Sequence, residues 1–102
     1  MEAELRGKVV LVTGGARRVG KGIALGFARA GANVAIHHHA SPDEAATTAD
    51  EIRACGVRAW VAQADFSQCG EIAPAIEGAA AHFGRLDVLV NSASVFGSGD
   101  FL

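Results

Sequence analysis

The chain has 102 residues, of which 50% are hydrophobic and 20% are charged, and its formal net charge is −2. These proportions predict one small globular domain or part of a larger one, and the slight negative charge argues against a protein whose main ligand is nucleic acid. The sequence has no apolar run long enough to span a membrane, and its acidic, polar start is not typical of a signal peptide. Cys55 and Cys69 show no metal-like spacing, so we expect free thiols and a cytoplasmic location.

Strands and helices are predicted to alternate along the chain. Short apolar runs bounded by turn residues predict strands at residues 8–13, 33–38, 58–62 and 86–91. Apolar residues at helical spacing predict helices at residues 20–30, 42–54 and 68–83. A glycine follows closely after each helical segment, where a helix commonly ends.

Each predicted helix carries a further signal. The apolar face of the first helix is expected to contain Val19, Ile23, Phe27 and Ala30. The second helix is expected to begin with Ser41 as N-cap, Pro42 at the first helical position and Glu44 three residues after the cap. The third helix is expected to place Ile72, Ile76, Ala79 and Phe83 along one face.

Apolar strands separated by amphipathic helices predict a parallel sheet covered on both faces. Right-handed crossovers then give an α/β fold, a Rossmann-type doubly wound sheet with the strand order 3-2-1-4. In that order the fourth strand, with the apolar residues Val88 to Val90, lies at an open edge of the sheet.

A glycine-rich turn follows the first predicted strand, and two phosphate-binding interpretations compete for it. Gly15, Gly20 and Lys21 have the spacing of a triphosphate-binding loop. That loop needs a serine or threonine after its lysine to hold magnesium, and here Gly22 follows. It also needs an acid at the end of a later strand, whereas Asp87 begins its strand. The triphosphate interpretation is therefore disfavoured.

A dinucleotide interpretation fits the same turn better. Gly14 directly follows the strand and permits a tight turn, and Gly20 lets the start of the helix approach a diphosphate. We predict that backbone N–H groups between Thr13 and Gly20 bind this diphosphate, flanked by Arg17 and Arg18. The alternative for the two arginines is a solvated basic pair.

The end of the second strand indicates which dinucleotide is bound. A cofactor without a 2′-phosphate calls for an acid there, but the chain has His37, His38, His39, Ala40 and Ser41. We therefore predict NADP(H), with His39 and Ser41 donating to the 2′-phosphate. The alternative is a metal site, which only His37 and His39 could share because neighbouring strand residues point to opposite faces.

Four segments together resemble the short-chain dehydrogenase/reductase family. Residues 13–20 are similar to the family's Thr-Gly-x-x-x-Gly-x-Gly turn, with Arg18 at the middle glycine. An arginine there resembles the pteridine reductases, whose motifs are also similar to HHHAS (37–41), ADFS (64–67) and NSASVF (91–96). The resemblance implies a reductase that transfers hydride from NADPH to a pterin or to a carbonyl substrate.

The resemblance also implies roles for individual residues. Cofactor contacts are expected from Gly14, Arg17, Arg18, Val19, Gly20, His37, His39, Ser41, Asp65, Phe66, Asn91 and Ala93. Asp65 would bind the adenine ring, although an ordinary acid before a helix is the alternative, and the Asn91 side chain would tie neighbouring strand ends together beside the ribose. Ser94 and Phe96 would contact the substrate, with local packing as the alternative for Phe96.

The family's Tyr-x-x-x-Lys pair, which supplies the catalytic proton, has no counterpart in the sequence. The chain contains no tyrosine, and its lysines are Lys8 and Lys21. We therefore expect residues 1–102 to be the N-terminal cofactor-binding part of such an enzyme, with no catalytic residue and no activity alone. A separate segment or chain would supply the missing half, and the resemblance implies a homo-oligomer, a dimer or tetramer. The alternative function is a non-catalytic dinucleotide-binding module or redox sensor. The alternative substrate is a 3-oxoacyl or other small carbonyl compound.

Overall fold

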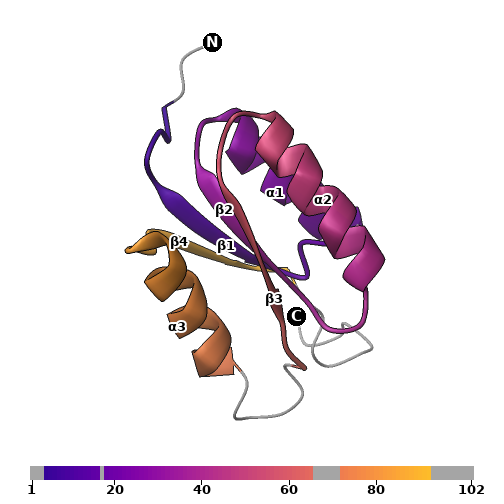
Figure 1. Cartoon of the computed structure of the whole chain (residues 1–102). Helices are drawn as coiled ribbons and strands as arrows, with labels where there is room; N and C mark the ends of the chain where they lie inside the picture. Colours follow the sequence, from indigo (N-terminus) through magenta and orange to yellow (C-terminus); the bar gives the residue numbers. More distant parts are fainter. Residues whose placement is uncertain (1–3, 17, 66–71, 93–102) are drawn as a thin grey trace.

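A four-stranded parallel sheet lies at the centre of the molecule, with helices on both faces (Figure 1). The computed structural model describes residues 4–16, 18–65 and 72–92. The strands are β1 (Val9–Thr13), β2 (Asn33–His38), β3 (Ala59–Gln63) and β4 (Val88–Asn91). The helices are α1 (Arg18–Arg29), α2 (Pro42–Ala54) and α3 (Ile72–Phe83). Their order in the sheet, β3-β2-β1-β4 with every neighbouring pair parallel, confirms the predicted fold.

The element bounds follow the sequence pattern to within one residue, except at the start of β4 and at two helix starts. Strand β4 begins at Val88, two residues later than expected. Helix α1 begins at Arg18, two residues earlier than expected, because arginine contributes no apolar signal to the periodicity. Helix α3 is described from Ile72, and residues 68–71 of the predicted helix lie outside the described residues. Cys55 is a free and exposed thiol, and Cys69 also lies outside the described part.

Helices α1 and α2 cover one face of the sheet, and the predicted apolar face of α1 is only partly correct. Val19 is 73% exposed, so it does not belong to the core. The buried positions are instead the small residues Gly20, Ala24 and Ala28, together with Leu25. Small side chains at a four-residue spacing let the helix axis lie close to the sheet, while Ile23 and Phe27 pack at its sides.

The opposite face of the sheet is covered by α3. Its predicted apolar face is confirmed where side chains are described: Ala79 is fully buried against Leu11 and Ala35 of the central strands, and Ile76 and Phe83 pack around them. Both faces of β1 are therefore covered, and all five of its residues are buried. This double coverage explains why the strand is apolar almost throughout rather than alternating.

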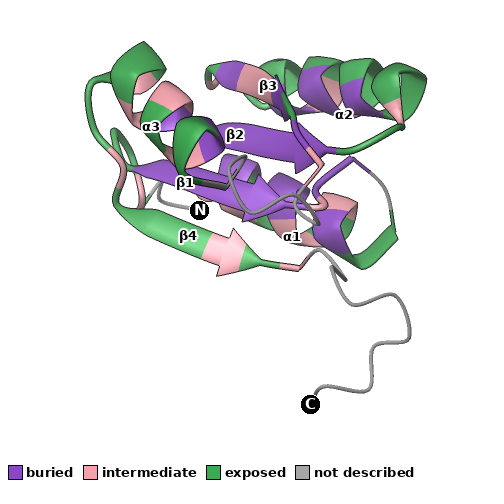
Figure 2. Ribbon diagram, turned by 90° about the horizontal axis from the view of Figure 1, so that it is seen from below, coloured by how far each residue is buried: buried purple, intermediate pink, exposed green. Residues whose placement is uncertain are grey.

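Strand β4 forms an edge of the sheet, as expected, and pairs with β1. Most of β4 is exposed (Figure 2), and Val88 and Leu89 are 37% and 48% exposed. The pairing begins at Asp87, whose carboxylate accepts the Val9 N–H at 2.8 Å and is hydrogen-bonded by Arg85 at 2.8 and 2.9 Å. These hydrogen bonds, led by Arg85, lower the pKa of Asp87. In the described part of the chain, none of the helices has the length and apolar character needed to cross a bilayer.

Candidate functional site

The glycine turn lies at the carboxyl end of β1. His37 of β2 accepts hydrogen bonds from the backbone N–H groups of its first two residues, Gly14 and Gly15. Gly14 has a φ of 66°, in the left-handed region that favours glycine. Its N–H donates to His37 Nδ1 at 3.0 Å, and the Gly15 N–H donates to the His37 carbonyl at 3.1 Å. These two N–H groups are bonded within the chain, which corrects their predicted part in a cradle for a diphosphate between Thr13 and Gly20.

Gly20 is required for a contact within the protein. A Cβ added there would lie 2.7 Å from the Gly14 carbonyl carbon and 2.8 Å from Ser92 Oγ, closer than real Cβ atoms approach. The missing side chain therefore lets the first turn of α1 pack directly against the glycine turn. The sequence interpretation gave Gly20 the role of approaching a diphosphate, whereas this contact fixes where the start of the helix lies.

Arg18 adopts a backbone conformation that arginine rarely takes. Its φ is 59°, in the left-handed region, which costs a non-glycine residue about 1 kcal/mol or more. Glycine adopts this conformation without that cost, so a glycine at position 18 would suit the turn. Arg18 and Val19 are both exposed, and the first turn of α1 contains no acid. The start of α1 therefore combines a guanidinium with the positive end of the helix dipole, which favours an anion.

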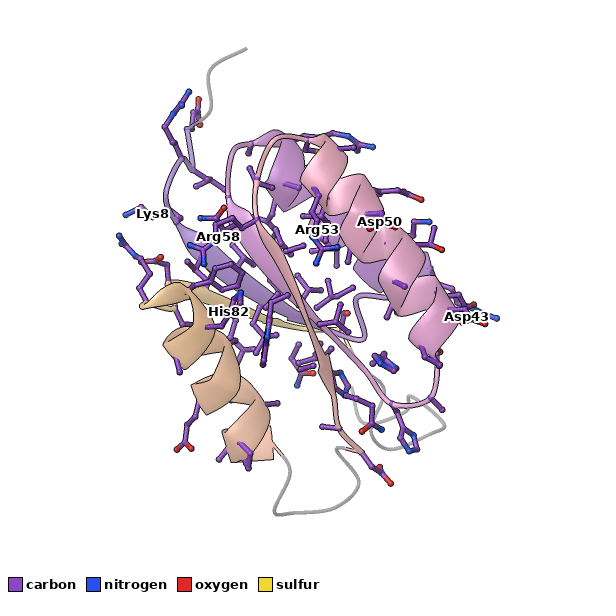
Figure 3. The ribbon with its side chains drawn as sticks, in the orientation of Figure 1. Lys8, Asp43, Asp50, Arg53, Arg58 and His82 are labelled. Atoms are coloured by element: carbon purple, nitrogen blue, oxygen red, sulfur yellow. The ribbon has the colours of Figure 1, made fainter. Side chains whose placement is uncertain are left out.

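A cavity of about 350 Å³ separates this helix start from the start of α2, lined by Ala16, Arg18, Lys21, Asp43, Glu44 and Thr47. Lys21 also forms an ion pair with Glu51 at 3.1 Å. Figure 3 places Asp43 at the amino end of α2, at the opposite end of the sheet from Lys8 and Arg58. The cavity thus lies at the carboxyl end of the strands, where ligands bind in open α/β sheets.

Thr48, which the sequence analysis did not single out, holds the glycine turn from α2. Its side chain is fully buried, and its hydroxyl donates to the Ala16 carbonyl at 2.7 Å. The signal in the sequence was a polar residue at a core position of α2, between Ala45 and Ile52. Such a residue needs a hydrogen-bond partner in the interior, and the turn supplies it.

Hydrogen bonds at the ends of β1 and β4 complete the rim of the site. The Thr13 hydroxyl lies 2.9 Å from Asn91 Oδ1, which confirms that the Asn91 side chain ties neighbouring strand ends. The Ser92 N–H donates to Thr13 Oγ1 at 3.0 Å, and the Ser92 hydroxyl donates to the Thr13 carbonyl. Ser92 was not predicted, because its role depends on Thr13 and Gly20, which are distant in sequence.

The three consecutive histidines have different surroundings. His37 is buried between the glycine turn and the Ala64 carbonyl, while His38 is buried and its Nδ1 accepts the Ser41 N–H at 3.0 Å. Burial lowers the pKa of both rings. The His39 ring is largely exposed, with Nε2 3.5 Å from Asp65 Oδ2. Among the residues described, no three His, Cys, Asp or Glu side chains come together as a metal site would need.

Ser41 occupies the N-cap position of α2, and Pro42 follows it as expected. Its side chain makes no capping hydrogen bond, so that part of the prediction was wrong. The residue instead donates its N–H to His38, and its carbonyl accepts the N–H of Ala45. Five other predicted site residues, Arg17, Phe66, Ala93, Ser94 and Phe96, lie outside the described residues.

A doubly wound parallel sheet whose first strand leads through a glycine turn into an exposed helix start defines a nucleotide-binding α/β domain. Comparison with known families gives a narrower assignment. The sequence model of the family described as short chain dehydrogenase matches residues 8–102. The chain therefore belongs to the short chain dehydrogenase family.

Relatives in this family match most of the chain but extend well beyond it. A hydroxynaphthalene reductase of Aspergillus fumigatus is 44% identical over 91 residues, which are 89% of this chain and 33% of the relative. A 3-oxoacyl-[acyl-carrier-protein] reductase of Staphylococcus epidermidis is 40% identical over 88 residues, which are 86% of this chain and 36% of the relative. The chain thus spans about a third of the length of the curated relatives it matches.

Solved structures show the same likeness. A short chain dehydrogenase from Burkholderia cenocepacia, crystallised in complex with NADP, superposes with a TM-score of 0.88 at 42% identity, covering 97% of this chain and 41% of that one. A dehydrogenase from the same species with bound NADP has a TM-score of 0.83 at 37% identity, covering 89% of this chain and 36% of that one.

Proposed function

We propose that the chain is the NADP(H)-binding part of a short-chain reductase. The observation that carries the proposal is Arg18, held at a φ of 59° at the exposed start of α1. A residue kept in a costly conformation suggests a functional role for its side chain, and a guanidinium there can bind phosphate oxygens in a bidentate manner. The residues present therefore fit a dinucleotide, with the diphosphate at the start of α1 and Arg18 and Val19 beside it.

The preference for NADP(H) over NAD(H) is supported by the end of β2. Residues 37–41 contain no Asp or Glu, so this segment supplies no carboxylate that would repel a 2′-phosphate. The exposed His39 ring and Ser41 are the proposed donors, with Arg17 nearby. Asp43 and Glu44 line the same cavity as Arg18. Their carboxylates would disfavour a phosphate there, so comparing the affinities for NADPH and NADH is a demanding test of the preference.

Other contacts are proposed for residues at the rim. Asp65 and Phe66 would line the adenine pocket, and Asn91 and Ala93 would lie beside the ribose and the rest of the cofactor. Because His37 is enclosed between Gly14 and Ala64, we assign it a supporting role instead of a direct contact.

For the substrate we propose a flat aromatic or small carbonyl compound. Pterin reduction is the finer hypothesis, and it depends on Arg18 and on Ser94 and Phe96 as substrate contacts. The names of the relatives, a hydroxynaphthalene reductase and a 3-oxoacyl reductase, support reduction more generally. NADPH supplies a hydride when it is bound. Since the chain has no tyrosine, we propose that the proton donor belongs to residues outside these 102, and that the chain alone binds cofactor without turnover.

The test is calorimetric titration of the chain with NADPH and with NADH. We expect tighter binding of NADPH, and a loss of about tenfold or more in Arg18→Ala and Arg18→Gly, since a hydrogen bond to a charged group contributes about 1.5 kcal/mol. Arg18→Gly should also stabilise the fold, because it removes the left-handed arginine. Arg29→Ala, at the exposed far end of α1, is the matched control. Tighter binding of NADH, or unchanged affinity in Arg18→Gly, would contradict the proposal.

The absence of tyrosine also suits a second candidate, a non-catalytic dinucleotide-binding module. The gene sequence that follows the codon for Leu102 distinguishes the two. A downstream Tyr-x-x-x-Lys motif supports the reductase, and a stop codon supports the module.

A further inference from the structure

His37 joins two parts of the site that are distant in sequence. Its Nδ1 accepts the Gly14 N–H at 3.0 Å, and its Nε2 lies 2.7 Å from the Ala64 carbonyl beyond β3. Its own carbonyl accepts the Gly15 N–H at 3.1 Å. The residue is 3% exposed, so these bonds are shielded from water.

The partners of the ring determine its protonation state. A backbone N–H can only donate and a carbonyl oxygen can only accept, so Nδ1 must be bare while Nε2 carries hydrogen. The ring is therefore neutral in this arrangement. A second proton on Nδ1 would face the N–H of Gly14, and that hydrogen bond would be replaced by a repulsion between two donors.

The position of Gly14 determines where the cofactor-binding helix begins. Gly20 packs so closely on the Gly14 carbonyl that no Cβ fits between them. Any displacement of the glycine turn therefore moves Arg18 and the first N–H groups of α1, which have no carbonyl partner within the helix.

We propose that His37, as a neutral ring, is a positioning residue that holds the glycine turn, and through it the start of α1, in the form that binds the cofactor. The inference rests on the proposed function for its link to the cofactor, and it assigns His37 no contact with the cofactor or substrate. Protonation of the ring releases Gly14 and weakens cofactor binding.

The direction of the pH dependence follows from the surroundings of the ring. Burial lowers the pKa of His37 below its ordinary value of 6.5, and the neighbouring charges of His38 and His39 act in the same direction, while the bond to Ala64 opposes them. Charged groups on the elements around the ring are Arg18 at the start of α1, Asp43 and Glu44 in the first turn of α2, and Asp65 after β3. Cofactor binding is therefore complete at neutral pH and decreases below the ordinary histidine pKa.

Two variants separate the titration from the hydrogen bond. His37→Asn can place an amide oxygen near the position of Nδ1, so it keeps an acceptor for Gly14 without a titrating group. His37→Leu removes the acceptor. The matched control is His82→Asn, because that ring is exposed in the last turn of α3, on the other face of the sheet from α1.

The experiment measures the affinity for NADPH between about pH 5 and pH 8, alongside the NMR shift and hydrogen exchange of the Gly14 amide without cofactor. We expect the affinity of the native chain and of His82→Asn to fall about tenfold on acidification. The affinity of His37→Asn should stay nearly constant, and that of His37→Leu should be weaker at every pH by a similar factor. A pH-independent native affinity, or the same acid loss in His37→Asn, overturns the proposal.

The Gly14 amide distinguishes this inference from the proposed function. If the amide shift and exchange follow the titration of His37, the ring holds the turn, and absence of NADPH binding then counts against the proposed function alone. If His37 titrates while the Gly14 amide does not change, the positioning role is wrong whatever the cofactor does.

Discussion

Substitution of Gly20 by alanine tests the close packing of α1 on the glycine turn. The added Cβ would lie 2.7 Å from the Gly14 carbonyl carbon and 2.8 Å from Ser92 Oγ, and the backbone of the turn is held by His37 and Thr48. Overpacking against atoms that cannot move aside costs about 3 kcal/mol, while alanine regains about 1 kcal/mol over glycine within a helix. We therefore expect the free energy of unfolding to fall by about 2 kcal/mol.

The assay is urea and thermal unfolding, with Gly22→Ala as the matched control. A Cβ at Gly22 meets nothing within 4 Å, so this variant should gain about 1 kcal/mol from helix propensity. For a chain of this length 1 kcal/mol corresponds to about 5 °C, so Tm should fall by about 10 °C in Gly20→Ala and rise by about 5 °C in Gly22→Ala. Equal stability of the two variants would refute the packing argument.

Two further substitutions examine other supports of the site and the sheet. Thr48→Val should lower the free energy of unfolding by about 1–3 kcal/mol, because the Ala16 carbonyl loses its buried donor. The control, Thr47→Val, changes an exposed hydroxyl. Its free energy of unfolding should stay within about 0.5 kcal/mol of the native value in the same urea assay. The pKa of Asp87 is lowered from 3.8, mainly by Arg85, so its contribution to stability is present above that pH and is lost as the pH falls below it. In acid unfolding, Asp87→Asn should therefore show a smaller loss of stability, and an unchanged acid profile would show that this carboxylate does not contribute.

Most of the fold could be predicted because its signals are local. Each strand is an apolar run, each helix is amphipathic, and the handedness of crossovers fixes the strand order. The bounds of β2 were predicted to the residue. The buried face of α1 was harder, because large apolar residues dominate a periodicity pattern while Gly20, Ala24 and Ala28 make the closest approach.

Most bonds within the site could not be predicted, because they join distant segments. The tie from Asn91 to the neighbouring strand end was the exception. His37 and Ala64 are separated by 27 residues, and Thr48 and Ala16 by 32. Ser41 has the composition and position of an N-cap, but its N–H is bound by His38 and its side chain caps nothing. The sequence predicted a binding site at the turn that contains Gly14 and Gly20. The residues that hold this turn in shape became visible only in three dimensions.

The most direct test of the central claim is the amide NMR spectrum of the chain during titration with NADPH. If the start of α1 binds the diphosphate, the largest shifts should occur at Arg18, Val19 and Gly20, with smaller ones near Ser41, while the amides of α3 (Ile72–Phe83) remain unchanged. Shifts centred on α3, or an unchanged spectrum at saturating NADPH, would contradict the account.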